Sequence, residues 1–245
     1  MAHQYSGIAV YAHLEIHEKV AELLGDLPRG LRVLDVPSGP GALSARLRDL
    51  GFDVEAGDLF PESFLAEGIT CQGVDLNGPL PMADATYDVV VCVEGIEHLE
   101  SHFGLVRELR RVLKPGGRLV ITTPNITSVN SRLRFFLTGF FSLAERPVSE
   151  QARDETNDHI HPLTYPELRF MLQTNGLRVT QVTGAVRQQG AWFGAFVPLG
   201  KWYLRRACRK ERDLAQCAVN RGVTERMFSA DLLRTRDLVV VAEAV

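Results

Sequence analysis

Short apolar runs alternate with amphipathic stretches along most of the chain. The run from Leu31 to Val36 is aliphatic and rich in β-branched residues, which predicts a buried strand. The next stretch places leucines 43, 47 and 50 on one helical face, with Gly51 following as a helix stop. Similar patterns predict strands at 52–58, 68–74, 87–94, 118–124, 177–183 and 237–245, and helices at 11–24, 103–113 and 166–173. This alternation indicates an α/β fold with a mostly parallel sheet and helices on both faces.

Two long connections break this alternation, at 125–161 and 184–236. Both exceed the usual length of a connection in a compact domain, which predicts that they carry function. Each contains an aromatic, apolar segment, so we expect residues 1–245 to form a single domain in which the two insertions form a lid. That lid is predicted to close an apolar pocket lined by Phe135 or Phe136 and by Trp192 or Phe193.

Composition and charge narrow the class of protein. The chain has 245 residues, 45% of them hydrophobic, which is enough for one packed domain. Its formal net charge of −3 gives no overall attraction to nucleic acid, so no DNA partner is expected. None of the four cysteines belongs to a CxxC pair, which argues against a zinc ribbon. Charged residues stand where a signal peptide would be apolar, so we expect a cytoplasmic protein.

A glycine-containing turn, Asp35 to Gly41, connects the first predicted strand to its helix. Glycines let the backbone approach a ligand closely, although an ordinary tight turn has the same composition. Asp58 ends the second strand about 20 residues later, where a ribose-binding carboxylate belongs. Asp75 and Leu76 end the third strand, and Glu94 ends the fourth. These groups therefore converge on the carboxyl edge of the sheet, where open α/β folds bind their ligands.

These segments together resemble the class I S-adenosylmethionine-dependent methyltransferase family. The resemblance rests on VLDVPSGPG, the strand that ends in Asp58, VDLNGPLP before YDVVVCVEGIEHLE, LKPGGRLVITTPN and the closing pair of strands. It implies a Rossmann-like sheet of seven strands, with the last strand antiparallel, and S-adenosylmethionine as cofactor. It also implies that the turn holds the methionine part of the cofactor, Asp58 the ribose, and Asp75 with Leu76 the adenine. The implied cofactor-binding residues are Asp35, Pro37, Ser38, Gly39, Gly41, Asp58, Leu59, Asp75, Leu76 and Glu94.

The turn departs from the family pattern at Pro37, where the family usually has glycine. Proline removes a backbone donor, so one contact at this point is lost or changed. A nicotinamide-dependent dehydrogenase is the alternative from another enzyme class, but it predicts a GxGxxG turn that this chain lacks. A protein that binds the cofactor without catalysing a reaction is a further alternative, because an intact cofactor site does not exclude it.

Two histidines are candidates for catalysis. Transfer of a methyl group to oxygen or nitrogen needs alignment and removal of a proton, and His98 stands beside the fourth strand in EGIEH. His161 precedes a helix that Thr164 and Glu167 are predicted to start as a capping box. This second region is similar to quinone-type and glycan-type O-methyltransferases. We therefore expect His98 and His161 to act on a small-molecule, glycan or lipid-linked acceptor.

The EGIEH segment also resembles the metal site of methyltransferases that modify the 2′-hydroxyl at the 3′ end of small RNAs, with His159 and His161 as further ligands. A metal-dependent RNA 2′-O-methyltransferase is therefore the alternative function. ExxEH is common without a metal, and the chain as a whole is not basic, so no metal ion is expected.

The segment 190–212 joins an uncharged, aromatic run to a basic one. The uncharged run of about 11 residues is too short to span a bilayer. An aromatic segment followed by a basic one is typical of helices that lie on a membrane surface. An internal lid and a homodimer contact remain alternatives for this segment.

Overall fold

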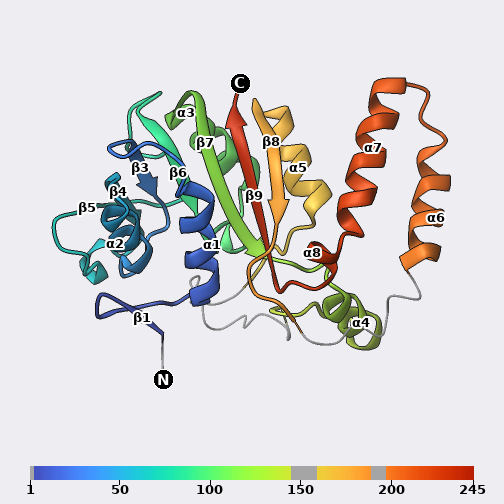
Figure 1. The fold of residues 1–245 in the computed structure, drawn as a ribbon, viewed down its shortest axis with the longest axis horizontal. Coiled ribbons are helices and arrows are strands. Elements are labelled where there is room, and N and C mark those ends of the chain that lie inside the picture. The colour runs from blue at the N-terminus through green and yellow to red at the C-terminus, as the bar shows by residue number, and fades with distance from the viewer. Residues whose placement is uncertain (1–2, 145–158, 189–196) are drawn as a thin grey trace.

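The computed structural model describes residues 3–144, 159–188 and 197–245. A seven-stranded sheet forms its centre, in the order β5-β4-β3-β6-β7-β9-β8 (Figure 1). The strands are β3 Arg32–Asp35, β4 Asp53–Asp58, β5 Thr70–Gly73, β6 Tyr87–Cys92, β7 Leu113–Pro124, β8 Leu177–Thr183 and β9 Asp237–Ala244. All seven fall on predicted strands.

The last strand, β9, runs antiparallel to both of its neighbours, β7 and β8, while the pairs from β5 to β7 are parallel. It lies inside the sheet, with Asp237 opposite Pro124. The expected mostly parallel sheet with an antiparallel last strand is therefore confirmed. Because β9 runs in reverse, its first residues lie at the carboxyl edge of the parallel strands.

Helices cover both faces of the sheet, as expected. Side chains alternate along β6, so Val90 joins the core beneath α3 (His102–Val112) and α5 (Tyr165–Thr174). Val89 and Val91 face the opposite way and join the core beneath α1 (Leu14–Leu24) and α2 (Ala42–Asp49). The predicted capping box is confirmed, since Thr164 and Glu167 bind each other's backbone amides at the start of α5.

The chain before α1 forms a small hairpin of β1 (Gln4–Tyr5) and β2 (Ile8–Ala9). Its turn residues, Ser6 and Gly7, both have positive φ. The expectation of a helix from Tyr11 is wrong by three residues, because α1 begins at Leu14. The residues in between are free of the helix and reach the carboxyl edge of the sheet.

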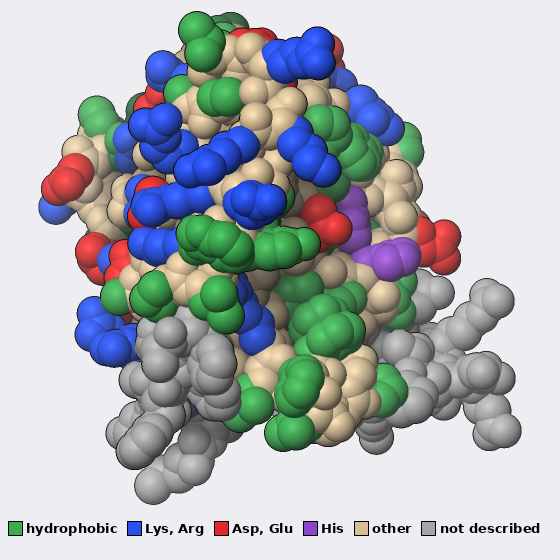
Figure 2. Space-filling model, turned by 90° about the vertical axis from the view of Figure 1, so that its right-hand side faces the viewer, with side chains coloured by type: hydrophobic (Ala, Val, Ile, Leu, Met, Phe, Trp, Pro, Cys, Tyr) green, Lys and Arg blue, Asp and Glu red, His purple; other side chains and the backbone are tan. Residues whose placement is uncertain are grey.

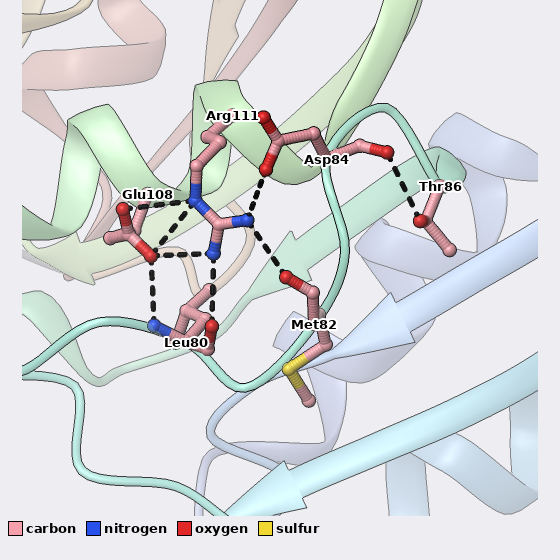
Figure 3. A network of polar contacts seen from close by, with 6 residues as sticks. All are labelled: Leu80, Met82, Asp84, Thr86, Glu108 and Arg111. Carbon is pink, nitrogen blue, oxygen red and sulfur yellow. Dashed lines mark hydrogen bonds and ion pairs between the residues drawn. The ribbon is translucent and has the colours of Figure 1, made fainter.

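Arg111 ties α3 to the loop that leads into β6 (Figure 3). Its guanidinium lies 2.7 Å from Glu108 Oε2 and 2.6 Å from Asp84 Oδ1. It also donates to the carbonyl oxygens of Leu80 and Met82 at 2.9 and 2.8 Å. Each side of this guanidinium therefore has an acceptor, and the loop is fixed on the helix.

The described parts of the two insertions are helical. The first contains α4 (Val129–Thr138), and the second contains α6 (Val197–Cys208), α7 (Leu214–Met227) and α8 (Ala230–Leu233). Helices α6 and α7 stand beyond the edge strand β8 (Figure 1), and Arg226 of α7 donates to Val182 O at 3.3 Å. These helices therefore lie beside the sheet, so the expectation that they form a lid is wrong for this part of the second insertion.

Candidate functional site

A cavity of about 1170 Å³ lies at the carboxyl edge of the sheet. It exceeds the roughly 300–1,000 Å³ of a pocket for one small ligand. Its wall comes from the ends of β3 to β6, the segment before α1, and short pieces of both insertions. Among the residues lining it are Tyr11, His13, Pro37, Ser38, Gly39, Asp58, Leu59, Asp75, Leu76, Glu94, His98, His159, Arg236 and Asp237.

The turn after β3 needs its glycines. Gly39 has a φ of +52° and lines the cavity, while Gly41 has a φ of +93°, is the N-cap residue of α2 and is not among the lining residues. A Cβ on Gly41 would lie 2.6 Å from a ring carbon of Phe64, too close for any side chain. Pro37 packs against Gly95, where an added Cβ would lie 2.6 Å from Pro37 Cδ. The conformation of the turn therefore depends on the positive φ values of its glycines and on close packing around them. Pro37 is part of the cavity wall.

Asp58 connects the end of β4 to this turn. Its Oδ2 accepts from the amide of Gly39 at 2.7 Å, and its Oδ1 accepts from the amide of Phe60 at 3.0 Å. Each oxygen accepts from one amide and keeps further acceptor capacity, since a carboxylate has about four lone-pair sites. Leu59 and Leu76 are apolar neighbours on the wall, and the exposed Asp75 accepts from the amide of Asn77 at 2.9 Å.

Asp35 lies behind the turn and not among the residues that line the cavity. It is fully buried, and its Oδ2 accepts from the hydroxyl of Ser44 at 2.5 Å. Burial raises the pKa of this carboxyl to about 7. The geometry supports a role in fixing α2 against β3, and direct cofactor contact by Asp35 stays a prediction.

Two glutamates follow β6. Glu94 lines the cavity with a φ of +48°, and its Oε1 accepts from the hydroxyl of Thr122 at 2.8 Å. Such a conformation is uncommon outside glycine and is concentrated at functional sites. Glu97, in the short helix η2 (Ile96–His98), is fully buried and accepts from the hydroxyl of Thr123 at 3.0 Å. Burial raises the pKa of both carboxyls, and the charge of Glu94 adds to the rise at Glu97.

Glu97, His98 and His159 come together beside the cavity. Their ligand atoms lie within 4.8 Å of one another, and His98 Nε2 is 3.9 Å from Glu97 Oε1. Two ligands on one zinc ion at about 2.1 Å and tetrahedral angles would be about 3.4 Å apart, so the group would have to contract around an ion. The absence of a bound metal ion stays our prediction.

The two candidate catalytic histidines differ in position. His98 lines the cavity, as does His159. His161 is not among the lining residues; its Nδ1 lies 2.9 Å from Leu99 O, and its amide donates to Glu97 O at 3.0 Å. Its ring packs edge-on against His102. A role for His161 in contact with an acceptor stays a prediction, and the geometry favours His159 as the imidazole of this segment that faces the cavity.

Sequence reasoning missed part of the wall. The segment Ala9 to His13 lines the cavity, and so do Arg236 and Asp237 at the start of β9. The Ser6-Gly7 pair, a common turn sequence, was the signal that a hairpin precedes α1. No local pattern around Arg236 marks it, because the pairing of β9 with β7 brings it to this edge.

The aromatic residues of the first insertion do not form the expected pocket. Phe135 and Phe136 are exposed and are not among the residues that line the cavity, so this prediction is wrong. The described part of that insertion contributes Leu143 and His159 instead. Trp192 and Phe193 lie outside the described residues.

Comparison with known proteins gives consistent matches. The sequence profile of a family described as a methyltransferase domain matches residues 8–182. The ubiquinone biosynthesis O-methyltransferase of Burkholderia ambifaria (strain MC40-6) is 27% identical over 164 residues, covering 63% of this chain and 68% of that protein. The protein of the same name from Xanthomonas axonopodis pv. citri is 30% identical over 166 residues, covering 64% of this chain and 66% of the relative.

Solved structures show the same fold at low identity. A SAM-dependent methyltransferase from Archaeoglobus fulgidus has a TM-score of 0.58 at 17% identity, covering 93% of this chain and 92% of that chain. The 1,6-didemethyltoxoflavin-N1-methyltransferase of Burkholderia thailandensis, with bound S-adenosylhomocysteine, has a TM-score of 0.54 at 14% identity. The match covers 95% of this chain and 79% of that chain. The [4+2]-cyclase SpnF has a TM-score of 0.54 at 19% identity, and the match covers 100% of this chain and 87% of that chain. The fold alone therefore does not fix the reaction.

Proposed function

The chain belongs to the class I S-adenosylmethionine-dependent methyltransferase family, and on that premise we propose that it methylates a hydroxyl oxygen of a small-molecule acceptor. The observation that carries the proposal is the pairing of Asp58 with the Gly39 turn on the wall of one large cavity. A carboxylate that can bind a diol and a glycine-containing turn at adjacent strand ends are the groups that this cofactor needs.

The residues present fit S-adenosylmethionine. Asp58 would hold the ribose hydroxyls, because it lines the cavity and its oxygens, which accept from one amide each, retain acceptor capacity. Asp75 and Leu76 would hold the adenine, and the stretch from Pro37 to Gly39, together with Glu94, would hold the methionine part. When bound, the cofactor supplies a methyl group that its positive sulfur has activated.

His98 is the candidate general base. It lines the cavity next to the end of β6, and the buried carboxyl of Glu97 lies 3.9 Å from its Nε2. An imidazole there can take the proton of an acceptor hydroxyl as the oxygen is methylated. His159, whose ring centroid lies 4.8 Å from that of His98, would face the same acceptor.

Two relatives named ubiquinone biosynthesis O-methyltransferase support oxygen as the atom methylated and a small molecule as the acceptor. Glycan and lipid-linked acceptors, a homodimer and peripheral membrane contact remain predictions. Lysine and arginine side chains gather on the face that carries α6 and α7, beside hydrophobic side chains (Figure 2), and the exposed residues of α6 include Leu199, Trp202 and Tyr203. No helix within the described ranges is long and apolar enough to cross a bilayer.

The group of Glu97, His98 and His159 favours one second candidate, the metal-dependent methylation of a 2′-hydroxyl at the 3′ end of an RNA. In that case an ion would polarise the hydroxyl in place of a histidine base. The two candidates differ in their acceptor and in their response to a chelator.

The test is an assay of S-adenosylhomocysteine release from S-adenosylmethionine, with catechols and a short single-stranded RNA as acceptors. We expect turnover with a catechol and none with RNA. His98→Gln should lower turnover about 10²-fold or more, the usual share of a general base, while calorimetry finds S-adenosylhomocysteine binding unchanged. Release of S-adenosylhomocysteine with RNA alone would favour the second candidate. Binding of S-adenosylhomocysteine without turnover on either class would favour a non-catalytic protein.

A further inference from the structure

Arg236 stands out on the wall of the cavity. It is the one lysine or arginine among the residues that line the cavity in the described part of the chain, where Asp58, Glu62, Asp75, Glu94 and Asp237 supply the acidic groups. The backbone of Arg236 is fixed on both sides, because its amide donates to Val186 O at 2.9 Å and its carbonyl accepts from the amide of Asn125 at 2.8 Å. Its side chain thus starts from a rigid point at the carboxyl edge.

No carboxylate of the described residues forms an ion pair with Arg236. Its Nη1 instead contacts Nε2 of His13, a residue 223 positions away in the chain. A neutral imidazole nitrogen can accept from a guanidinium, but it brings no negative charge. The contrast with Arg111, which has two carboxylates and two carbonyls around it, is direct. Arg236 is thus oriented by an uncharged acceptor, and within the described residues no carboxylate lies at ion-pair distance from it.

Two acidic groups at this end of the cavity, Asp237 and Glu94, direct their hydrogen bonds to other groups. Asp237 directs its carboxylate oxygens to the amides of Ala185 and Val186, at 2.6 and 2.7 Å. Glu94 accepts from the hydroxyl of Thr122; burial raises the pKa of its carboxyl, and the charge of Arg236 opposes that rise without a direct ion pair. The planar guanidinium therefore keeps donors for an incoming oxyanion, for which its paired N–H groups are well matched.

The position of Arg236 separates it from the residues expected to hold the cofactor. Along the carboxyl edge, Asp75, Asp58 and the Gly39 turn follow β5, β4 and β3, and Glu94 follows β6. Arg236 lies beyond them, at the start of β9, next to the end of β7. The ribose and adenine sites are therefore on one side of Glu94, and Arg236 is on the other.

We propose that Arg236, oriented by His13, binds a carboxylate or phosphate group on the methyl acceptor, so that the protein selects anionic hydroxylated acceptors. This inference rests on the proposed function, because it assumes that the cavity receives a methyl acceptor. The other source of the same chemistry is the carboxylate of the cofactor's own methionine part. The two sources predict different responses to loss of Arg236, since one affects acceptor binding and the other affects cofactor binding.

The test compares two probes that differ in one charge, 3,4-dihydroxybenzoate and 3,4-dihydroxybenzamide. Each is titrated calorimetrically into the wild type, Arg236→Gln and Arg236→Lys, with and without S-adenosylhomocysteine, and inorganic phosphate is titrated as a third probe. We expect the wild type to bind the benzoate at least about ten-fold more tightly than the benzamide, the effect of one hydrogen bond to a charged group. Arg236→Gln should lose this preference, and Arg236→Lys should keep part of it.

Arg234→Gln is the matched control, because Arg234 is exposed, lies two residues away and is not among the residues that line the cavity. It should retain the preference, and the melting temperatures of all variants should agree within a few degrees. Equal binding of both organic probes by the wild type, with no phosphate binding that depends on Arg236, would overturn the proposal. A fall in S-adenosylhomocysteine affinity in Arg236→Gln with the benzoate preference intact would assign Arg236 to the cofactor and also overturn it. Failure of the wild type to bind S-adenosylhomocysteine at all would refute the proposed function, while the titrations without it still decide what Arg236 binds.

Discussion

The two halves of the carboxyl edge present their polar groups differently. On the side of β3, β4 and β5, Asp58 accepts from two amides, and the Gly39 turn is fixed by packing and backbone bonds. On the side of β6, β7 and β9, the described residues leave Arg236 without an ion pair and Glu97 Oε1 without a hydrogen bond. The cavity-lining groups of the first side are held in place by hydrogen bonds and packing before any ligand binds, as suits a cofactor that does not vary. The second side retains a guanidinium without an ion pair and a carboxylate oxygen without a hydrogen bond, both of which an acceptor could use.

The largest expected effect comes from the first side, at Gly41. Gly41→Ala would combine a side chain at a φ of +93° with overlap against Phe64 and Ala66. These two costs together should lower the free energy of unfolding by about 2–4 kcal/mol. Urea denaturation measures it. Gly116→Ala is the control, since Gly116 also has a positive φ but an added Cβ meets nothing within 4 Å; an equal loss in both variants would mean that packing at the turn contributes little.

A pH-dependent effect is expected at Asp35. The folded-state pKa of about 7 is above the usual 3.8, because burial disfavours the charged form. The stability contributed by the protonated carboxyl is therefore present below about pH 4 and is lost as the pH rises through 7. Asp35→Asn, which stays neutral, should gain about 2–3 kcal/mol over the wild type between pH 5 and pH 8. Urea denaturation at several pH values measures this, and parallel pH profiles for the two proteins would show that Asp35 titrates normally.

Loss of the Asp58 carboxylate should weaken binding of the cofactor and leave binding of the acceptor unchanged. Asp58→Ala removes an acceptor for the ribose hydroxyls and should weaken S-adenosylhomocysteine binding by about 1.5–3 kcal/mol. Calorimetry on both proteins measures the change. The control is Asp53→Ala at the other end of β4, where the side chain is exposed and far from the cavity wall. An unchanged affinity in Asp58→Ala would place the ribose elsewhere.

The smallest expected effect is that of a chelator on the β6–β9 side of the edge. The group of Glu97, His98 and His159 is expected to hold no stoichiometric divalent ion, because its atoms are spread more widely than a bound ion would hold them. A chelator should therefore leave turnover and melting temperature unchanged, and elemental analysis should find less than one ion per chain. One tightly bound ion, lost with activity on chelation, would contradict this and support the second candidate function.

The first side of the edge could be predicted from the sequence because each of its features is local. A strand, a turn and a helix lie within Leu31 to Leu50, and Asp58 ends the next strand, so spacing alone locates these groups. Arg236 and His13 could not be found this way, because only the insertion of β9 between β7 and β8 brings them into contact. The lid expectation failed where aromatic composition was taken for burial: Phe136 of α4 is 83% exposed.

A structure with bound S-adenosylhomocysteine tests the central claim, that the β3–β5 side binds the methyl donor and the β6–β9 side receives the acceptor. The account predicts the ribose hydroxyls within hydrogen-bond distance of Asp58 and the adenine next to Asp75 and Leu76. It also predicts that the sulfur faces the space between Glu94, His98 and Arg236. A ligand whose ribose lies away from Asp58, or whose methionine carboxylate occupies Arg236, would contradict it.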